Sequence, residues 1–330
     1  MTMQAHETRP RNEAPVRVVG AARFRVATER GAGTVPLFTG GASDGAKVER
    51  VVIMLHGRLR DADAYLRTAE HALAASSIDP RGTLLVVPQF VATADVEHHA
   101  LEDDLLHWEW TAWMGGLDAR GPCALSSFDV LDALVAAYAR DRARLPMLRE
   151  IVIAGHSGGA QVAHRYAIAG KAASADNVKL RYVIANPSSY VYFDASRPGA
   201  PCDEANDWKY GLDRLPRYAC GRSASVMESR YVQSEVIYLL GELDCDPAHP
   251  ALDRSCAANA QGPHRLARGR AYYAYLLARH PRLRHRLDEV PGAGHSGEAM
   301  FVSEQGVRAL FGDGTRLVRS AAIDAGGASE

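Results

Sequence analysis

The sequence predicts an α/β fold with a mostly parallel central sheet and helices on both faces. Continuous apolar runs recur along the chain and are separated by stretches with helical periodicity. A run that is apolar at every position is typical of a strand buried on both faces, and a parallel crossover needs a helix. The runs occupy residues 51–55, 84–87, 151–154, 182–185, 236–240 and, more weakly, 286–290. Their alternation with helices predicts one layered α/β domain.

Helices and an opening hairpin complete this pattern. We expect helices at 61–76, 126–143, 158–170, 263–279 and 297–311. Residues 16–26 and 35–38 flank a glycine-rich turn, which predicts an antiparallel pair.

Three kinds of segment depart from the alternation. Residues 89–125 and 186–233 are long interruptions, and we expect them to be inserted loops that act as a cap or lid. Residues 1–15 and 316–330 are expected to be a disordered start and a flexible tail. A single domain over 16–315 follows from these limits.

The composition excludes several classes of partner. The chain has 330 residues, 47% of them hydrophobic, and a formal net charge of −1. Such a chain has no long-range field that recruits nucleic acid or an anionic membrane. No apolar stretch approaches the ~20 residues of a membrane span. No signal peptide is visible in the polar N-terminus, which favours a cytoplasmic location. The oligomeric state is left open.

The five cysteines allow a second interpretation of that location. Cys202 and Cys220 are close in the sequence, as are Cys245 and Cys256, while Cys123 stands alone. Two short loops closed by disulfides would be typical of an exported protein, and five unpaired thiols of a cytosolic one. Both interpretations stay open at this point. No C-x-x-C or H-x-E pattern indicates a metal site, so we expect no metal.

The motif that indicates chemistry follows the run at 151–154. GHSGG at 155–159 joins this predicted strand to a predicted helix, which is the setting of a G-x-S-x-G nucleophile elbow. Glycines on both sides permit a tight turn that raises the hydroxyl of Ser157 above the sheet edge. The amides of the following helix can receive a negative oxygen there. The alternative is a glycine-rich turn without chemistry.

An acid and a base follow two further strands. Ligands bind at the carboxyl ends of strands in open parallel sheets, so polar residues at those ends are candidates. His295 follows the last run in a glycine-rich turn, and we predict that it is the base that activates Ser157. Asp244 follows the run at 236–240 and is expected to orient His295. Asp246 is the rival acid, and Glu242 a more distant one.

The first central run ends in His56-Gly57-Arg58. A glycine here lets the loop backbone approach a reacting carbonyl, and the amide of Arg58 or Gly57 is expected to face the developing oxyanion. The amide of Gly158 would be the second donor. His56 and His156, which flank these groups in the sequence, are expected to contact the substrate. The alternative for this segment is an ordinary strand-ending turn.

The chain order of serine, aspartate and histidine, each after an apolar strand, resembles the α/β-hydrolase superfamily from about residue 16 to 311. GHSGG matches the elbow, HGR the oxyanion loop, GELD the acid turn and GAGHS the histidine turn. NPSSYVYFD at 186–194 and CAANAQGPHRLARGRAYY at 256–273 are similar to a little-characterised group of bacterial and fungal hydrolases. The resemblance implies an α/β-hydrolase fold and serine-hydrolase chemistry, and it names no substrate.

Aromatic residues lie in both long insertions. Trp108, Trp110 and Trp113 follow the second run, and Tyr190 and Tyr192 follow the run that ends at residue 185. We expect these rings to line a cleft for an apolar or aryl group. The alternative is that they only pack the insertions onto the sheet.

A basic run lies in the last third of the chain, and we interpret it as a solvated helix face. It comprises Arg265, Arg268, Arg270, Arg279, Arg282, Arg284 and Arg286.

Together these features predict a serine hydrolase that cleaves a small carboxylic ester with an apolar or aromatic portion, without a cofactor. Three alternatives stay open. The same three side chains serve amide or peptide hydrolysis, and they serve thioester hydrolysis or acyl transfer to an alcohol. A non-catalytic ligand-binding protein of the same fold is the third, because fold alone does not prove activity.

Overall fold

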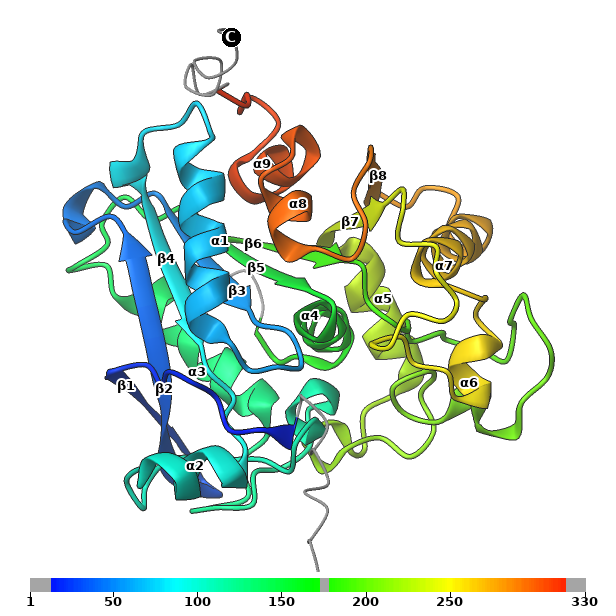
Figure 1. The fold of residues 1–330 in the computed structure, drawn as a ribbon, viewed down its shortest axis with the longest axis horizontal. Coiled ribbons are helices and arrows are strands. Elements are labelled where there is room, and N and C mark those ends of the chain that lie inside the picture. The colour runs from blue at the N-terminus through cyan, green and yellow to red at the C-terminus, as the bar shows by residue number, and fades with distance from the viewer. Residues whose placement is uncertain (1–12, 173–177, 319–330) are drawn as a thin grey trace, which may run out of the picture.

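The predicted mostly parallel sheet is confirmed by the computed structural model, which describes residues 13–172 and 178–318. Within these residues, eight strands form one sheet in the order β1-β2-β4-β3-β5-β6-β7-β8 (Figure 1). β2 pairs antiparallel with both β1 and β4, and the other neighbours are parallel. The strands are β1 Ala22–Thr28, β2 Gly31–Gly41, β3 Arg50–Leu55, β4 Thr83–Pro88, β5 Glu150–His156, β6 Lys179–Ala185, β7 Glu235–Gly241 and β8 Arg286–Val290.

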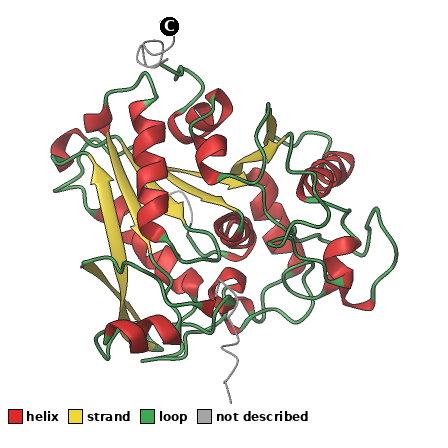
Figure 2. Cartoon of the chain, viewed as in Figure 1, coloured by secondary structure: helices red, strands yellow, loops and turns green. Residues whose placement is uncertain are grey.

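Helices cover both faces of this sheet (Figures 1 and 2). One face carries α1 Ala62–Ala74, α8 Gly297–Phe301 and α9 Glu304–Phe311. The other carries α3 Ser127–Arg140, α4 Gly158–Ala169, α5 Ala224–Gln233 and α7 Arg265–Arg279. Side chains of the central strands alternate between two apolar cores: Val51 and Ile53 of β3 belong to one, and Val52 and Met54 to the other. This burial on both faces explains the uninterrupted apolar runs.

The helix expected at 297–311 is two helices. α8 ends before Val302, and Ser303 begins α9 by accepting a hydrogen bond from the amide of Gly306 at 2.9 Å. A serine that caps a helix N-terminus in this way starts a new helix instead of continuing the old one.

The long insertions contain helices that periodicity did not predict. α2 Thr93–His99 lies in the first insertion and α5 in the second, while α6 Cys256–Asn259 follows the predicted acid turn. α2 and α6 are short, so they present too few turns for an apolar period to be recognised.

Ordered contacts extend into both termini that were expected to be flexible. The carbonyl of Ala14 accepts a hydrogen bond from Arg60 Nη2 at 2.8 Å. Leu317 bridges Ser76 beside the end of α1, and the amide of Val318 donates to the carbonyl of Ala75. The remainder of the expected disorder, residues 1–12 and 319–330, lies outside the described residues.

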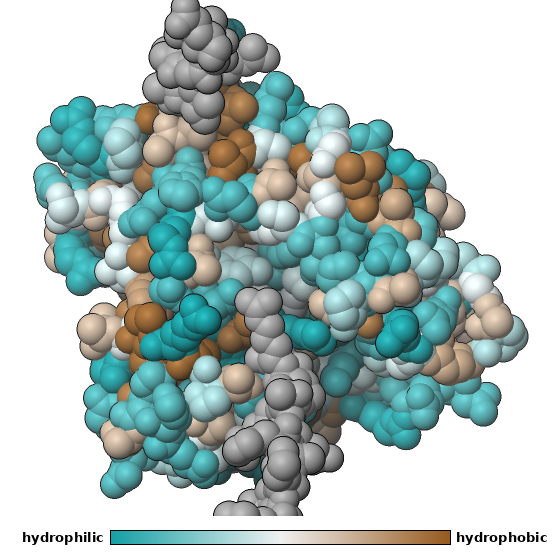
Figure 3. Space-filling model, in the orientation of Figure 1, coloured by the Kyte–Doolittle hydropathy of each residue, from teal (hydrophilic) through white to brown (hydrophobic). Residues whose placement is uncertain are grey.

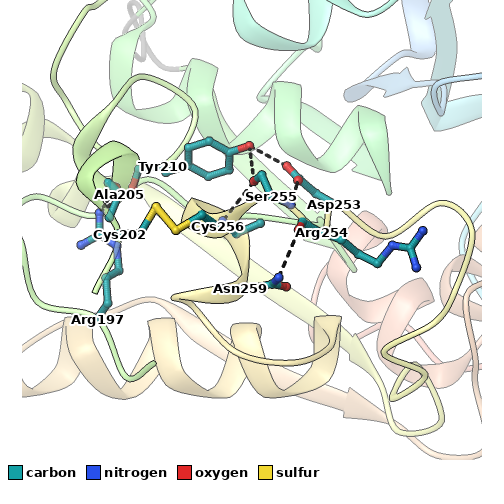
Figure 4. The surroundings of a disulfide bond; sticks show 10 residues. Arg197, Cys202, Ala205, Tyr210, Asp253, Arg254, Ser255, Cys256 and Asn259 are labelled. Carbon is teal, nitrogen blue, oxygen red and sulfur yellow. Dashed lines mark hydrogen bonds between the residues drawn. A yellow bond between two sulfur atoms is a disulfide. The ribbon is translucent and has the colours of Figure 1, made fainter. Parts of the chain in front are cut away.

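The disulfide differs from both interpretations that the sequence left open, the two short pairings and the five unpaired thiols. Cys202 bonds to Cys256, 54 residues away, while Cys220 and Cys245 are exposed free thiols and Cys123 is a half-buried one. Neither short loop is closed, because the second insertion folds back and places its 3-10 helix Asp203–Asn206 against α6. The bond therefore joins the insertion to the segment that follows the acid turn (Figure 4).

The surface agrees with the composition. On the face drawn in Figure 3, hydrophilic residues predominate and hydrophobic ones occur in small groups. In the described part of the chain, every helix is too short or too polar to cross a bilayer.

Candidate active site

The turn between β5 and α4 has the geometry of a nucleophile elbow. Ser157 stands at this turn with φ 55° and ψ −114°, a strained conformation for a residue with a side chain. The flanking glycines are required by close approach. A Cβ at Gly155 would collide with the backbone of Gly159, and one at Gly159 would collide with the carbonyl oxygen of Leu55. The chain can therefore pass this point only with glycine at both positions, which leaves the serine hydroxyl at the sheet edge.

The structure brings the serine, the histidine and the aspartate together. Ser157 Oγ lies 2.9 Å from His295 Nε2, and His295 Nδ1 lies 2.7 Å from Asp244 Oδ2. The three residues follow β5, β8 and β7, whose carboxyl ends share one edge of the sheet. A hydroxyl, an imidazole and a carboxylate linked in this order can pass a proton from the hydroxyl to the ring.

Burial distinguishes Asp244 from its rival. Asp244 is 3% exposed, whereas Asp246 is exposed and accepts a hydrogen bond from the nearby amide of Ala248. Arg265, also fully buried, donates from Nη1 to Asp244 Oδ1 at 3.2 Å. Burial raises the pKa of Asp244, but the hydrogen bond and charge of His295 and the charge of Arg265 outweigh it, and the net pKa is lowered. Asp244 is therefore a carboxylate at neutral pH.

The imidazole of His295 is held in its neutral form. Burial lowers its pKa below the ordinary value, the hydrogen bond to Asp244 opposes this, and the charge of Arg265 lowers it further. With Nδ1–H donated to Asp244, the free lone pair lies on Nε2, which faces Ser157. This tautomer is able to accept a proton from a hydroxyl.

Asn186, which sequence reasoning missed, links the two loops that carry the acid and the base. It follows β6 directly and has φ 49°. Its Oδ1 accepts from the amide of Gly241 at 2.8 Å, and its Nδ2 donates to the carbonyl of Gly294 at 3.4 Å. Its place directly after an apolar strand was the available signal, since an asparagine tolerates a positive φ and can bind backbone on both sides.

His56 orients the predicted oxyanion loop and does not contact a cavity. Its ring is fully buried, with Nδ1 donating to the carbonyl of Gly57 at 2.8 Å and Nε2 accepting from the amide of Phe90 at 2.9 Å. Burial lowers the pKa of His56 to about 4, so the ring is neutral and can do both. The expected substrate contact is therefore wrong, since both ring nitrogens are occupied by backbone.

Two amides lie free beside the serine. A trans peptide directs its N–H away from its C=O, so the amide of Arg58 points away from the ring of His56 that holds the Gly57 carbonyl. A Cβ built on Gly158 would lie 3.0 Å from the amide nitrogen of Arg58, which places that nitrogen next to Gly158. Within the described residues neither amide donates a backbone hydrogen bond. Both are available to an oxygen bound beside Ser157.

A cavity opens on each side of Ser157. The larger, about 470 Å³, is bordered by His295, His156 and Tyr65. The smaller, about 230 Å³, is bordered by Gly158 and by polar side chains of α4 and the second insertion. Ser157, Arg58 and Ala251 border both cavities. His156 is buried with its ring 4.6 Å from that of His295, and its expected contact with the substrate stays a prediction.

The aromatic residues expected to line the cleft border neither cavity. Trp108 and Trp113 are fully buried and pack on Phe90, and Tyr190 and Tyr192 are buried around Tyr272. The half-buried Trp110 lies under the guanidinium of Arg60, and the centre of its ring is 5.4 Å from Arg60 Cζ. The alternative, that these rings pack the insertions onto the sheet, is what the structure shows.

The basic run is only partly a solvated face. Arg270 and Arg279 pair with Glu289 and Glu228 at the surface. Arg265 and Arg268 are completely buried, and Arg268 donates from Nη1 to the carbonyls of Ser188 and Asp253 at 2.6 and 2.8 Å. Their i, i+3 spacing at the start of α7 was the available signal, because it places both on one helix face.

The described residues contain no cluster of three His, Cys, Asp or Glu side chains arranged to hold a metal ion.

No protein-family model and no curated protein sequence matches the chain. Solved structures do. The chain is similar to poly(aspartic acid) hydrolase-1 from Sphingomonas sp. KT-1, with a TM-score of 0.61 and 23% identity over 87% of this chain and 96% of that one. It is also similar to LpqC, a poly(3-hydroxybutyrate) depolymerase from Bordetella parapertussis, with a TM-score of 0.60 and 24% identity over 91% and 92%. These likenesses show the fold: the chain has the α/β-hydrolase fold.

Proposed function

We propose that this protein is a serine hydrolase that cleaves a carboxylic ester through an acyl-enzyme. The observation that carries the proposal is the pair of short hydrogen bonds that joins Ser157, His295 and Asp244, with two free amides beside the serine. The names of the two similar solved structures describe hydrolytic enzymes, and the fold is what this chain shares with them.

In the first half of the reaction Ser157 Oγ attacks the ester carbonyl carbon, and His295 Nε2 takes the hydroxyl proton. Asp244 keeps Nδ1 protonated and stabilises the imidazolium. The amides of Arg58 and Gly158 hold the oxyanion, and each such donor contributes roughly 3 kcal/mol to transition-state stabilisation in other enzymes. The C–O bond of the ester then breaks, and His295 gives its proton to the departing alcohol.

In the second half water attacks the acyl-enzyme. His295 takes a proton from the water, the same two amides hold the second oxyanion, and the proton returns to Ser157 Oγ as the acid is released. The reaction requires the three side chains and the two amides alone.

Each of the two cavities would hold a different part of the substrate. The alcohol must lie near His295, which protonates it, and His295 borders the larger cavity. The acyl group then lies on the side of Gly158, in the smaller cavity. Because no tryptophan borders either space, the positions of the rings do not support a preference for an aromatic acyl group.

Pre-steady-state hydrolysis of a 4-nitrophenyl ester tests the proposal. We expect a burst of about one equivalent of nitrophenol as the acyl-enzyme forms, and no burst from Ser157→Ala. An ester turned over at equal rates by both proteins, or by neither, would overturn the assignment. A matched 4-nitroanilide with the same acyl group is compared in parallel, and faster cleavage of the anilide would indicate an amidase instead. Absence of turnover together with tight binding of an ester would indicate the non-catalytic alternative.

A further inference from the structure

The smaller cavity is rich in positive charge. Arg58, Arg165 and Lys209 border it, and Asp253 is the one acidic residue that does so. In the described part of the chain no carboxylate oxygen lies within 4.0 Å of the charged nitrogens of these three side chains, the limit for an ion pair.

Arg165 is the most costly of the three to bury. It is 1% exposed, and its guanidinium donates only to neutral oxygens: the carbonyl of Met114 at 2.8 Å, Gln161 Oε1 at 2.7 Å and Ser189 Oγ at 3.0 Å. Its Nε is buried without a hydrogen-bond partner among the described residues. Burial lowers the pKa of Arg165 to about 10, which still leaves it cationic at neutral pH. A buried cation without an anion is unfavourable unless something else supplies the charge.

Lys209 is held over the same cavity by its neighbours in the second insertion. Its φ is 92°, a strained value for a residue with a side chain. Trp208 Nε1 donates to the carbonyl of Gly115 at 2.6 Å, and the Tyr210 hydroxyl donates to Asp253 Oδ2 at 2.7 Å, so both flanking residues are anchored. Lys209 and Arg165 border the same cavity. Burial lowers the pKa of Lys209, the charge of Arg165 lowers it further, and the charge of Asp253 opposes both.

Asp253 offsets only part of this positive charge. Its carboxylate raises the pKa of Arg165 and of Lys209 through its charge, but its two oxygens accept hydrogen bonds from other groups and form no ion pair with either cation. Oδ2 accepts from Tyr210 and Oδ1 accepts from the amide of Ser255 at 3.0 Å. Figure 4 shows this group beside the Cys202–Cys256 disulfide, which ties the insertion to the segment that carries Asp253. The wall of the cavity is thus fixed, and three positive charges face one negative charge across it.

We infer that the smaller cavity binds an anionic group carried by the acyl part of the substrate, such as the distal carboxylate of a dicarboxylic acid monoester. This inference rests on the proposed function, in which the acyl group of the ester occupies the smaller cavity. Gln161, which holds the Arg165 guanidinium, lies four residues into α4 from Ser157, about 6 Å along the helix. A six-carbon diacid such as adipate is therefore a suitable probe, because its two carboxyl groups are separated by roughly one helical turn.

Three 4-nitrophenyl esters test this on the full-length protein: the monoester of adipic acid, the ester of adipamic acid, and the ester of hexanoic acid. The first two have the same length and differ in charge. We expect kcat/KM for the adipate ester to exceed that for the adipamate ester by roughly tenfold or more, because a charge-assisted hydrogen bond replaces a neutral one. Equal values, or a preference for the neutral esters, would overturn the inference and leave the proposed function standing.

Variants of Lys209 locate the effect in this cavity. Lys209→Met should lower the ratio of kcat/KM between the adipate and adipamate esters by roughly tenfold, and Lys209→Glu should lower it further. Lys179→Met is the matched control, since Lys179 is exposed at the amino end of β6, and it should keep the wild-type ratio. A ratio that is unchanged in both Lys209 variants would contradict the assignment.

A binding measurement separates this inference from the reaction. Titration of Ser157→Ala with adipate should show binding that is about tenfold weaker after the added change Lys209→Met. If the wild-type protein hydrolyses none of the three esters but this binding pattern holds, the proposed function fails while the anion site stands. If adipate does not bind to Ser157→Ala, the anion site is refuted.

Discussion

The substitution Asp244→Asn tests the catalytic assignment through a single oxygen-to-nitrogen change. Asp244 Oδ2 lies 2.7 Å from His295 Nδ1 and fixes the proton on that nitrogen. An asparagine can present an N–H to His295 instead, which favours the tautomer with the proton on Nε2. That tautomer cannot accept the proton of Ser157.

Two magnitudes are expected for this change. Loss of the correct tautomer lowers kcat by about 10⁴ in the Ser-His-Asp enzymes where it has been made, equivalent to about 5.5 kcal/mol. The change also removes the carboxylate that Arg265 meets at 3.2 Å, with both side chains almost completely buried. An uncompensated buried charge of this kind lowers the free energy of unfolding by about 3–5 kcal/mol.

Active-site concentration, kcat on a 4-nitrophenyl ester and thermal unfolding are measured together. Asp246→Asn is the matched control, because Asp246 is exposed and an asparagine can still accept the hydrogen bond from Ala248. The double variant Asp244→Asn/Arg265→Met should regain much of the stability while kcat stays low. Equal losses of kcat in the two single aspartate variants, or a greater loss in Asp246→Asn, would refute the assignment of the acid.

The remaining predictions concern pH, packing and the disulfide. Hydrolysis needs neutral His295, whose pKa is lowered mainly by burial, so kcat/KM should fall only at pH values below the ordinary histidine range. The charge of Arg265 also lowers this pKa, so Arg265→Met should move the acidic limb of the pH profile to higher pH. A wild-type midpoint above pH 7 would contradict this. Gly159→Ala should give unfolded or insoluble protein, because its Cβ has no space, and a soluble protein with wild-type melting would count against the elbow geometry. Cys202→Ser/Cys256→Ser removes a disulfide that closes a loop of 54 residues, and it should lower the free energy of unfolding by about 4 kcal/mol, measured by denaturant titration. Unchanged stability would argue against the bond.

The sheet and the meeting of three distant residues could be predicted because each depends on local sequence. An uninterrupted apolar run indicates a strand buried on both faces wherever it lies. Parallel strands bring their carboxyl ends to one edge, so Ser157, Asp244 and His295 were expected to be neighbours without knowledge of any long-range contact. The hydrogen bonds between them agree with that expectation.

The roles of side chains in the insertions could not be predicted, because burial there depends on contacts between distant segments. Trp108 and Trp113 fill a core that exists only once the first insertion folds onto β3 and α3. In the sequence, aromatic residues that line a surface cleft cannot be told apart from aromatic residues that fill such a core. The sequence therefore led us to expect these rings at the cleft, whereas the structure buries them in the core.

The burial of two arginines and the pairing of the cysteines could not be predicted for the same reason. Arg265 and Arg270 belong to one helix and carry the same charge, yet one is buried against Asp244 and the other is at the surface. Cysteine pairing has many possible connectivities, and proximity in sequence does not select among them. Cys202 and Cys256 meet because the second insertion folds back on the segment after β7.

Intact-mass measurement after treatment with a fluorophosphonate determines whether Ser157 is an activated nucleophile. We expect one phosphonyl adduct on the wild-type protein, located on Ser157 by peptide mapping. We expect the same adduct on Ser225→Ala, a control at an exposed position of α5, and none on Ser157→Ala. A wild-type protein that stays unmodified, or an adduct that persists on Ser157→Ala, would contradict this expectation.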